Sequence, residues 1–273
     1  SSPVGRSALY NNTTASSNTA VGYTALFNNT TGGNLVATGY QALYTNSTGN
    51  DNSAFGWQAL YSSTTASNNT AVGFQALKAN TTGTKNTAVG RLALTAVTTG
   101  DENTAVGSNA LQLSTTASDN CAFGSSAMSS TTTGEDNAAF GYQALAGNTT
   151  ASENTAIGSK ALFANTTGAD NVAVGALSLD ANTEGDENTA IGKSALGYVA
   201  ADAITSGQKN VALGVGALGN ATTGELNTML GYAAGNAITT GQKNTVIGGF
   251  NGNQGGLDIR TSSNNIVLSD GDG

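Results

Sequence analysis

Apolar and polar residues recur along this chain with a fixed period of 17 residues. A glycine marks the period. Twelve glycines from Gly5 to Gly192 lie 17 residues apart, one step of 22 residues leads to Gly214, and Gly231 and Gly248 resume the spacing. These steps define fifteen copies of one unit, which we number so that this glycine is repeat position 5. So short and regular a period indicates a solenoid-like repeat architecture.

Each copy contains two short apolar segments. The first covers repeat positions 2–4, as in Thr19, Ala20 and Val21, and the second covers positions 7–10. Seventeen residues are too few for a helical repeat, which needs about 30 or more. We therefore predict two short strands per copy. The side chains at positions 3, 4, 8 and 9 are expected to face a thin core, and the position 5 glycine is expected at positive φ or at a close backbone approach.

This pattern predicts an all-β chain folded as a parallel β-solenoid of fifteen coils, each stacked in register on the next. Residues 1–250 are predicted to form the repetitive shaft, with one 22-residue coil at 193–214, and residues 251–273 a capping segment or the start of the next module. In such a stack the asparagine at position 1 should form a hydrogen-bonded ladder. The members of this predicted ladder are Asn18, Asn52, Asn69, Asn86, Asn103, Asn120, Asn137, Asn154, Asn171 and Asn188.

The predicted core is thin, because the inward residues are Ala, Val, Ala and Leu. Small cores usually need a further source of burial, and the association of chains supplies it. We therefore predict an oligomer in which some apolar columns face partner chains, in preference to a self-sufficient monomeric solenoid.

A resemblance to known repeats sharpens this prediction. The core Asn-Thr-Ala-Val-Gly-x-x-Ala-Leu, as in residues 18–26, resembles the head repeat of trimeric autotransporter adhesins. The longer pattern Asn-Thr-Ala-Val-Gly-Tyr-Gln-Ala-Leu-x-x-Asn-Thr-Thr-Gly is similar to repeats of bacteriophage tail fibres and related virion appendages. The resemblance covers residues 1–250 and implies a left-handed β-roll whose chains are intertwined or packed as a homotrimer. Residues 266–273 resemble sequence that, in such fibres, precedes a self-cleaving chaperone.

The resemblance also implies a function. It points to a structural fibre protein, the rigid trimeric shaft of a phage tail fibre or tailspike, which sits on the virion, joins other fibre or tail proteins and supports attachment to the host cell. The alternative is the head region of a bacterial trimeric adhesin, exposed on the cell surface and binding host glycans or matrix. A further alternative is an ice-binding solenoid, although the adjacent Thr-Thr pairs would point to opposite faces of a strand.

Composition narrows the candidate chemistry. A net charge of −8 disfavours nucleic acid as a partner. No run of about 18 apolar residues is present, so membrane insertion is not predicted. The chain has no histidine, and its one cysteine, Cys121, takes position 2, where threonine is usual. We therefore predict no enzymatic activity and, apart from the cation site described below, no cofactor.

Aromatic residues gather in the N-terminal copies, at repeat positions 6 and 10. Two stacked aromatic columns could contact a glycan, or they could stack on each other and on partner chains. The position 6 candidates are Tyr23, Tyr40, Trp57 and Phe74, and the position 10 candidates are Tyr10, Phe27, Tyr44 and Tyr61.

Acidic residues gather at position 17 of six consecutive copies. Their mutual repulsion could be relieved by a divalent cation such as calcium, which binds several carboxylate and carbonyl oxygens. The alternative is a solvated rim screened by salt. The candidate ligands are Glu102, Asp119, Asp136, Glu153, Asp170 and Glu187.

The longer copy after Gly192 contains five additional residues within 197–204. Insertions in solenoids leave the stack as loops on one face. We expect either a bulge against a neighbouring chain or a receptor contact.

Overall fold

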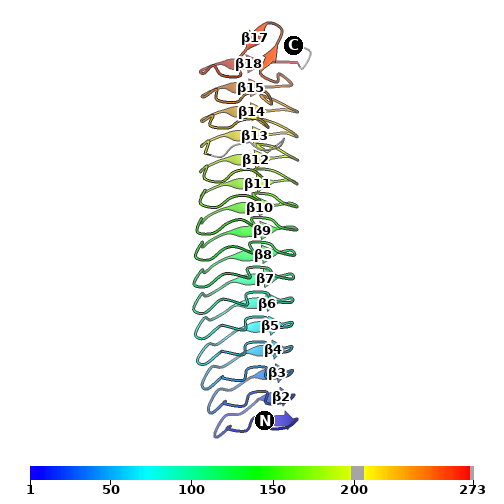
Figure 1. Cartoon of the computed structure of the whole chain (residues 1–273), viewed down its shortest axis with the longest axis vertical. Coiled ribbons are helices and arrows are strands. Elements are labelled where there is room, and N and C mark those ends of the chain that lie inside the picture. Colours follow the sequence, from blue (N-terminus) through cyan, green and yellow to red (C-terminus); the bar gives the residue numbers. More distant parts are fainter. Residues whose placement is uncertain (198–205, 271–273) are drawn as a thin grey trace. The chain divides into compact units, whose positions relative to one another are not determined.

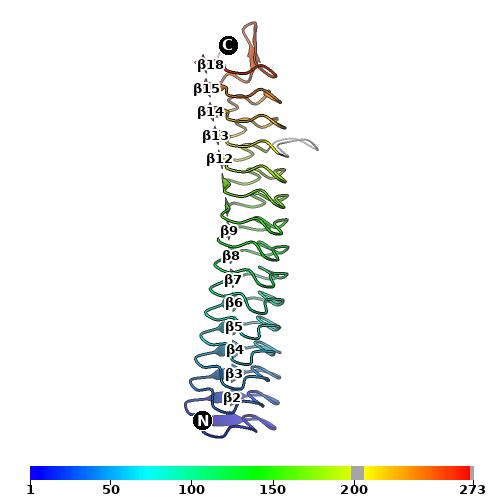
Figure 2. The ribbon, with the colours of Figure 1, turned by 90° about the vertical axis from the view of Figure 1, so that its left-hand side faces the viewer.

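The computed structural model describes residues 1–197 and 206–270, and the chain forms two compact units, Ser1–Asp136 and Asn137–Gly273. Every regular element in the described residues is a β-strand (Figures 1 and 2). None of those residues forms a helix that could cross a membrane. The predicted all-β, parallel β-solenoid of about fifteen coils is confirmed.

In the first unit, eight short strands stack in sequence order, and each pairs in parallel with the next. The register is that of the repeat, so Thr19 lies beside Val36 and Ala20 beside Ala37. The strands are β1 (Ser2–Val4), β2 (Thr19–Val21), β3 (Val36–Thr38), β4 (Ser53–Phe55), β5 (Thr70–Val72), β6 (Thr87–Val89), β7 (Thr104–Val106) and β8 (Cys121–Phe123).

The second unit repeats this arrangement, and its register survives the 22-residue step, because Thr189 pairs with Val211. The stacked strands are β9 (Ala138–Phe140), β10 (Thr155–Ile157), β11 (Val172–Val174), β12 (Thr189–Ile191), β13 (Val211–Leu213), β14 (Thr228–Leu230), β15 (Thr245–Ile247) and β18 (Ile266–Leu268). Between the last two, β16 (Asn253–Gln254) and β17 (Leu257–Asp258) form an antiparallel hairpin.

Parallel pairing continues beyond residue 250. Strand β18 pairs in register with β15, and Asn265 donates to Asn244 Oδ1 at 2.8 Å, as position 1 residues do elsewhere. Residues 251–264 thus complete a longer coil that carries the hairpin, and residue 265 begins another.

The prediction of two strands per coil is wrong, because only positions 2–4 form a strand. Residues at positions 7 and 9 have left-handed backbone conformations, with φ of 49° at Thr24 and 52° at Leu26, and the same values recur in the other coils. Extended strands need φ near −120°, so positions 7–10 form a turn. A left-handed conformation costs a non-glycine residue about 1–2 kcal/mol. At Leu26 it places a fully buried side chain in the core.

The prediction that position 4 faces the core is also wrong. In strands β2 to β15 position 3 is buried, whereas positions 2 and 4 lie on the opposite, outer face, as the alternation of a strand requires. Val72 and Ile157, both at position 4, are 37% and 43% exposed. Each unit therefore carries an apolar column on the outside of its sheet.

About a third of the buried side chains are polar. Alanines at positions 3 and 8 and leucine at position 9 are fully buried, and so are asparagines at positions 1 and 12, such as Asn69 and Asn80. Because hydrogen bonds join the asparagines along each stack, the core is held by polar ladders as well as by apolar burial.

Candidate functional site

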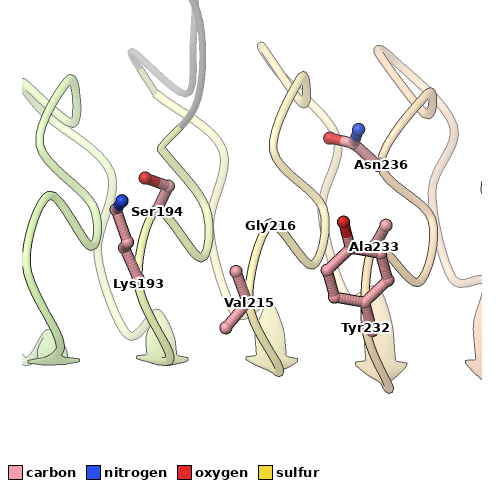
Figure 3. A pocket seen from close by; sticks show the side chains of 7 residues that line it. All are labelled: Lys193, Ser194, Val215, Gly216, Tyr232, Ala233 and Asn236. Atoms are coloured by element: carbon pink, nitrogen blue, oxygen red, sulfur yellow. The ribbon is translucent and has the colours of Figure 1, made fainter.

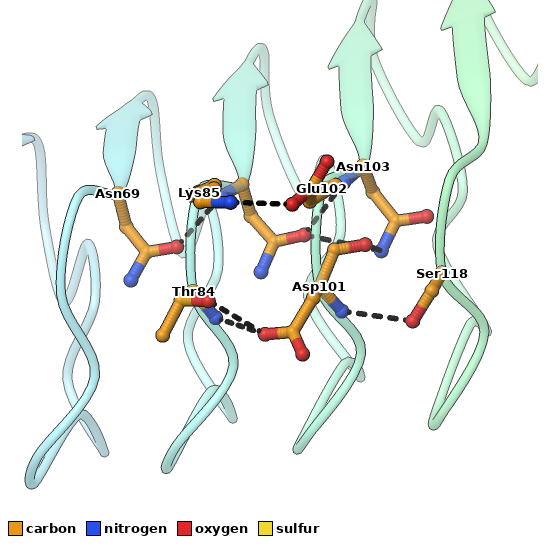
Figure 4. Close-up of polar contacts among 8 residues, drawn as sticks. Asn69, Thr84, Lys85, Asp101, Glu102, Asn103 and Ser118 are labelled. Atoms are coloured by element: carbon orange, nitrogen blue, oxygen red, sulfur yellow. Dashed lines mark hydrogen bonds and ion pairs between the residues drawn. The ribbon is translucent and has the colours of Figure 1, made fainter.

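In each unit the position 1 asparagines form a buried column, which Leu35 interrupts in the first unit and which Figure 4 shows for Asn69 and Asn103. From Asn69 to Asn120, and again from Asn154 to Asn244, the backbone N–H of each position 1 asparagine donates to Oδ1 of the preceding one, at 2.9 Å from Asn86 to Asn69. The side-chain Nδ2 donates to the carbonyl at position 15, at 2.7 Å from Asn86 to Gly100. Each of these asparagines therefore joins two coils and also closes its own turn.

A second asparagine column, at position 12, was missed by the sequence interpretation. Asn29 Nδ2 donates to Gly32 O at 2.9 Å, the same carbonyl that Asn18 reaches from position 1. Asn46 Nδ2 donates onward to Asn29 Oδ1 at 2.8 Å. Asparagine recurs at position 12 in seven copies, which was the available signal, but Ser63, Val97 and Ser114 interrupt the column.

The aromatic residues form two stacked columns within the first unit. Along position 6, the ring centroids of Tyr40 and Trp57 lie 5.8 Å apart and those of Trp57 and Phe74 lie 4.9 Å apart. The ring planes in both columns are within 11° of parallel. Each inner ring thus has both faces against its neighbours. A sugar ring needs such a face, so the columns are better suited to holding coils together than to stacking on a glycan.

Arginine closes the position 6 column at both ends. The guanidinium of Arg6 lies 5.9 Å from the ring centroid of Tyr23, and that of Arg91 lies 6.0 Å from the ring centroid of Phe74. Contacts of this kind contribute about 0.5–1 kcal/mol at exposed sites. They cover the two outer ring faces of the column, which leaves only ring edges toward solvent.

The acidic residues at position 17 lie at a left-handed turn, with φ of 58° at Glu102 and 57° at Asp170. Asparagine and aspartate are the non-glycine residues that tolerate this conformation best, which accounts for part of the acidic column. Glu102 pairs with Lys85 at 2.6 Å (Figure 4) and Glu187 with Lys209 at 3.5 Å.

The described residues of this column do not form a metal site. Within the described residues of each unit, no three or more Asp, Glu, Cys or His side chains are grouped so that they could hold a metal ion. The predicted calcium site at position 17 is therefore not supported. The acidic residues at position 16 instead accept hydrogen bonds from the preceding coil. Asp101 accepts hydrogen bonds from the backbone N–H and the hydroxyl of Thr84, and Asp186 accepts one from the backbone N–H of Ala169 at 2.8 Å.

Threonine hydroxyls at position 13 are also engaged by the stack. The Thr81 hydroxyl donates to Thr98 O at 3.0 Å and the Thr166 hydroxyl to Thr183 O at 2.9 Å. Hydroxyls that donate to protein carbonyls are poorly placed to order water, so this row gives ice binding no support.

Cys121 shows no sign of activation. It lies in β8 with its side chain partly buried, and burial raises the pKa of its thiol. A reactive cysteine needs a lowered pKa. Cys121 occupies repeat position 2, where threonine is the commonest residue in the other copies.

The second unit also has a hollow on its surface. It encloses about 290 Å³ and is lined by positions 6 and 7 of three successive coils and position 10 of the last (Figure 3). Its lining residues are Lys193, Ser194, Val215, Gly216, Tyr232, Ala233 and Asn236. The insertion predicted as a contact loop, residues 197–204, lies outside the described residues except for Gly197.

Asp180, at position 10 in the second unit, is expected to cost stability at neutral pH. Burial raises the pKa of its carboxyl, an effect that a backbone hydrogen bond and Lys160 oppose. A carboxyl with a raised folded-state pKa favours the folded state once protonated, and that contribution is lost as pH rises through the folded pKa. We expect Asp180→Asn to raise the thermal midpoint at pH 7 and to match the parent below about pH 3.8, the ordinary pKa of aspartate.

The matched control for this test is Asp170→Asn, at an exposed position of the same unit. Thermal melts of both variants followed by circular dichroism at the two pH values provide the measurement. An equal shift for the two variants would contradict the role assigned to burial.

Comparisons with protein-family models, with curated protein sequences and with solved structures return no match. The functional interpretation therefore depends on the geometry of the coils and of the surfaces that they carry.

Proposed function

We propose that this chain is a structural shaft whose copies associate side by side through the position 4 column. The supporting observation is the exposure of that column in both units. In the first unit its exposed members include Val21, Phe55, Val72 and Phe123, and in the second they include Phe140, Ile157, Ile191, Leu213, Leu230 and Ile247. Coil stacking places such residues about 4.8 Å apart. Contiguous apolar surface on this scale marks an interaction site.

A second copy of the chain is the occupant that fits best. A periodic column is complemented by another column with the same period, which a repeat protein of the same sequence supplies. Closed homo-oligomers are the commonest assemblies, and the resemblance of the repeat to fibre and adhesin sequences favours three chains. We propose a homotrimer that forms a stiff shaft in a virion appendage such as a tail fibre, joined to other fibre or tail proteins and supporting attachment to a host.

The head of a bacterial trimeric adhesin remains the alternative, because it has the same architecture and differs in location and in what it binds. Antibody labelling of virions and of bacterial surfaces distinguishes the two locations. The hollow in the second unit is the observation that favours a contact role in addition to a shaft role.

Association predicts a specific mutational response. Replacing Val72 and Ile157 together with lysine is expected to shift the protein from oligomer to monomer, because it puts two charges per chain into the apolar interface. Sedimentation velocity on the full chain measures the change. The control variant is Thr82→Lys with Thr167→Lys. Both threonines are exposed residues at position 14, so the control adds the same charge at a different position of the repeat.

We expect the control to remain an oligomer and both variants to keep the circular dichroism spectrum of the parent. A parent protein that sediments as a monomer would overturn the proposed association. If the two variants dissociate equally, the interface does not lie at position 4.

A further inference from the structure

The hollow exists because this part of the second unit lacks side chains that other coils carry. Position 7 holds glutamine in four copies, including Gln58 and Gln143, but here it is Ser194, Gly216 and Ala233. A Cβ built at Gly216 would have no atom within 4 Å. Position 10 is glycine in both Gly197 and Gly219. Small residues at repeat positions 7 and 10 therefore leave a depression across three coils.

Groups of different chemistry surround this depression (Figure 3). Lys193 stands at one end and forms no ion pair with any residue that the structure describes. Tyr232, at the other end, is 77% exposed, and its ring stacks on no other ring in the described chain. Val215 lies between them and is 48% exposed. This arrangement offers a cation, an open ring face and an apolar floor.

Two polar groups complete the lining. Asn236 Oδ1 is shielded from solvent and has no hydrogen-bond partner. The Ser194 side chain is nearly buried, and its hydroxyl donates to no acceptor in the described part of the chain. A ligand in the hollow can therefore hydrogen-bond to the Ser194 hydroxyl, whereas Asn236 Oδ1 is covered by protein atoms.

We propose that this hollow binds one acidic sugar residue, a hexuronic or sialic acid unit of a larger glycan. The carboxylate would pair with Lys193, the apolar face of the sugar ring would lie on Tyr232 and Val215, and a hydroxyl would hydrogen-bond to the Ser194 hydroxyl. The volume of about 290 Å³ lies just below the range for small-molecule sites, about 300–1,000 Å³, so the hollow suits a single ring. A phosphate site usually gathers several cationic groups, and this lining has one, Lys193.

This site differs from the aromatic columns that the sequence suggested as glycan contacts. In those columns each inner ring is covered on both faces by its neighbours, whereas Tyr232 presents an open face. The proposed sugar site goes beyond the shaft function and does not depend on association through position 4. The sedimentation test of association and the test of sugar binding can therefore give independent results.

The test uses saturation-transfer NMR and titration of the full chain with methyl β-D-glucuronide and with the methyl α-glycoside of N-acetylneuraminic acid. Methyl β-D-glucopyranoside, which lacks the carboxylate, is the reference ligand. We expect at least one acidic sugar to bind about tenfold more tightly than the reference, as one charge-assisted hydrogen bond allows. The stronger of the two acidic ligands identifies the sugar class.

Three substitutions test the lining with residues that other coils already hold at the same repeat positions. Lys193→Ala copies Ala176, Tyr232→Ser copies Ser159, and Ala233→Gln copies Gln143, so all three variants are expected to fold. We expect Lys193→Ala to abolish the preference for the acidic sugar. Tyr232→Ser and Ala233→Gln should each weaken binding about tenfold or more, the second by filling the hollow.

The matched control is Tyr142→Ser, which removes an exposed position 6 tyrosine that has Gln143 beside it and hence no hollow. It should bind like the parent. No binding of either acidic sugar, or equal losses from Tyr232→Ser and Tyr142→Ser, would overturn the proposed site. Equal binding of the reference sugar together with an unaffected Lys193→Ala variant would overturn its acidic specificity.

Discussion

Replacing Gly90 with alanine is expected to destabilise the first unit by about 3 kcal/mol or more. Gly90, at repeat position 5, has a φ of 140°, and an added Cβ would meet the carbonyl oxygen of Gly107 and lie 2.6 Å from its carbonyl carbon. These are backbone atoms of the next coil, so they cannot rotate away as a side chain could. The measurement is the urea midpoint followed by circular dichroism, with amide exchange at residues 87–94 to localise the damage.

Gly216→Ala is the matched control, since the same methyl group is added at another glycine with positive φ. Its φ is 67° and its surroundings are open. In the next coil Ala233 already occupies the same repeat position with a φ of 52°. We expect a loss of at most about 1 kcal/mol. Similar losses for the two variants would show that φ, and not the close approach of neighbouring coils, sets the requirement for glycine.

Asn86→Val is the second substitution for which we expect a large effect. It should lower the free energy of unfolding by about 3 kcal/mol. It removes the acceptor of the Asn103 N–H, at 2.9 Å, and the one side-chain donor that the described residues offer to Gly100 O, at 2.7 Å. Both groups are buried, and a buried group without its partner costs about 1–3 kcal/mol. The urea midpoint again provides the measurement.

Asn80→Val is its control, because it makes the same change at an equally buried asparagine of position 12. Asn80 donates to Gly83 O, but Asn69 also donates to that carbonyl at 2.9 Å, and Asn80 Oδ1 has no partner. The next coil already has Val97 at position 12. We expect a change below about 1 kcal/mol. Equal losses for Asn80→Val and Asn86→Val would contradict the different roles of the two columns.

These contrasts suggest how the thin solenoid is stabilised. Asparagine at position 1 is almost invariant within the chain, and each one satisfies backbone groups of two coils. Position 12 accepts Ser63, Val97 or Ser114, since its asparagines share acceptors that position 1 already satisfies. Interior hydrogen bonding therefore reduces the dependence on partner chains for folding, while the outer apolar column still favours association.

Several site predictions from sequence depended on which way a side chain faces. Tyr40 and Trp57 do lie in a column, as their spacing predicted, but the stack covers the ring faces that a glycan would need. Glu102 and Asp119 do recur at the coil spacing, yet their left-handed turn explains part of that pattern without a metal. The hollow near Tyr232 was not predicted, because it is produced by side chains that are small at Gly216 and Ala233.

The sequence by itself determined the period and the parallel register, because in-register stacking places equivalent residues of successive copies side by side. It did not predict that strand β18 continues the parallel stack beyond residue 250. It also determined that glycine is needed at position 5. Only the tertiary structure decided that positions 7–10 form a turn, since the sign of φ at Leu26 cannot be read from an apolar pattern. It also decided that Val72 faces outward and Asn80 inward, because these directions depend on how each coil closes around its polar core.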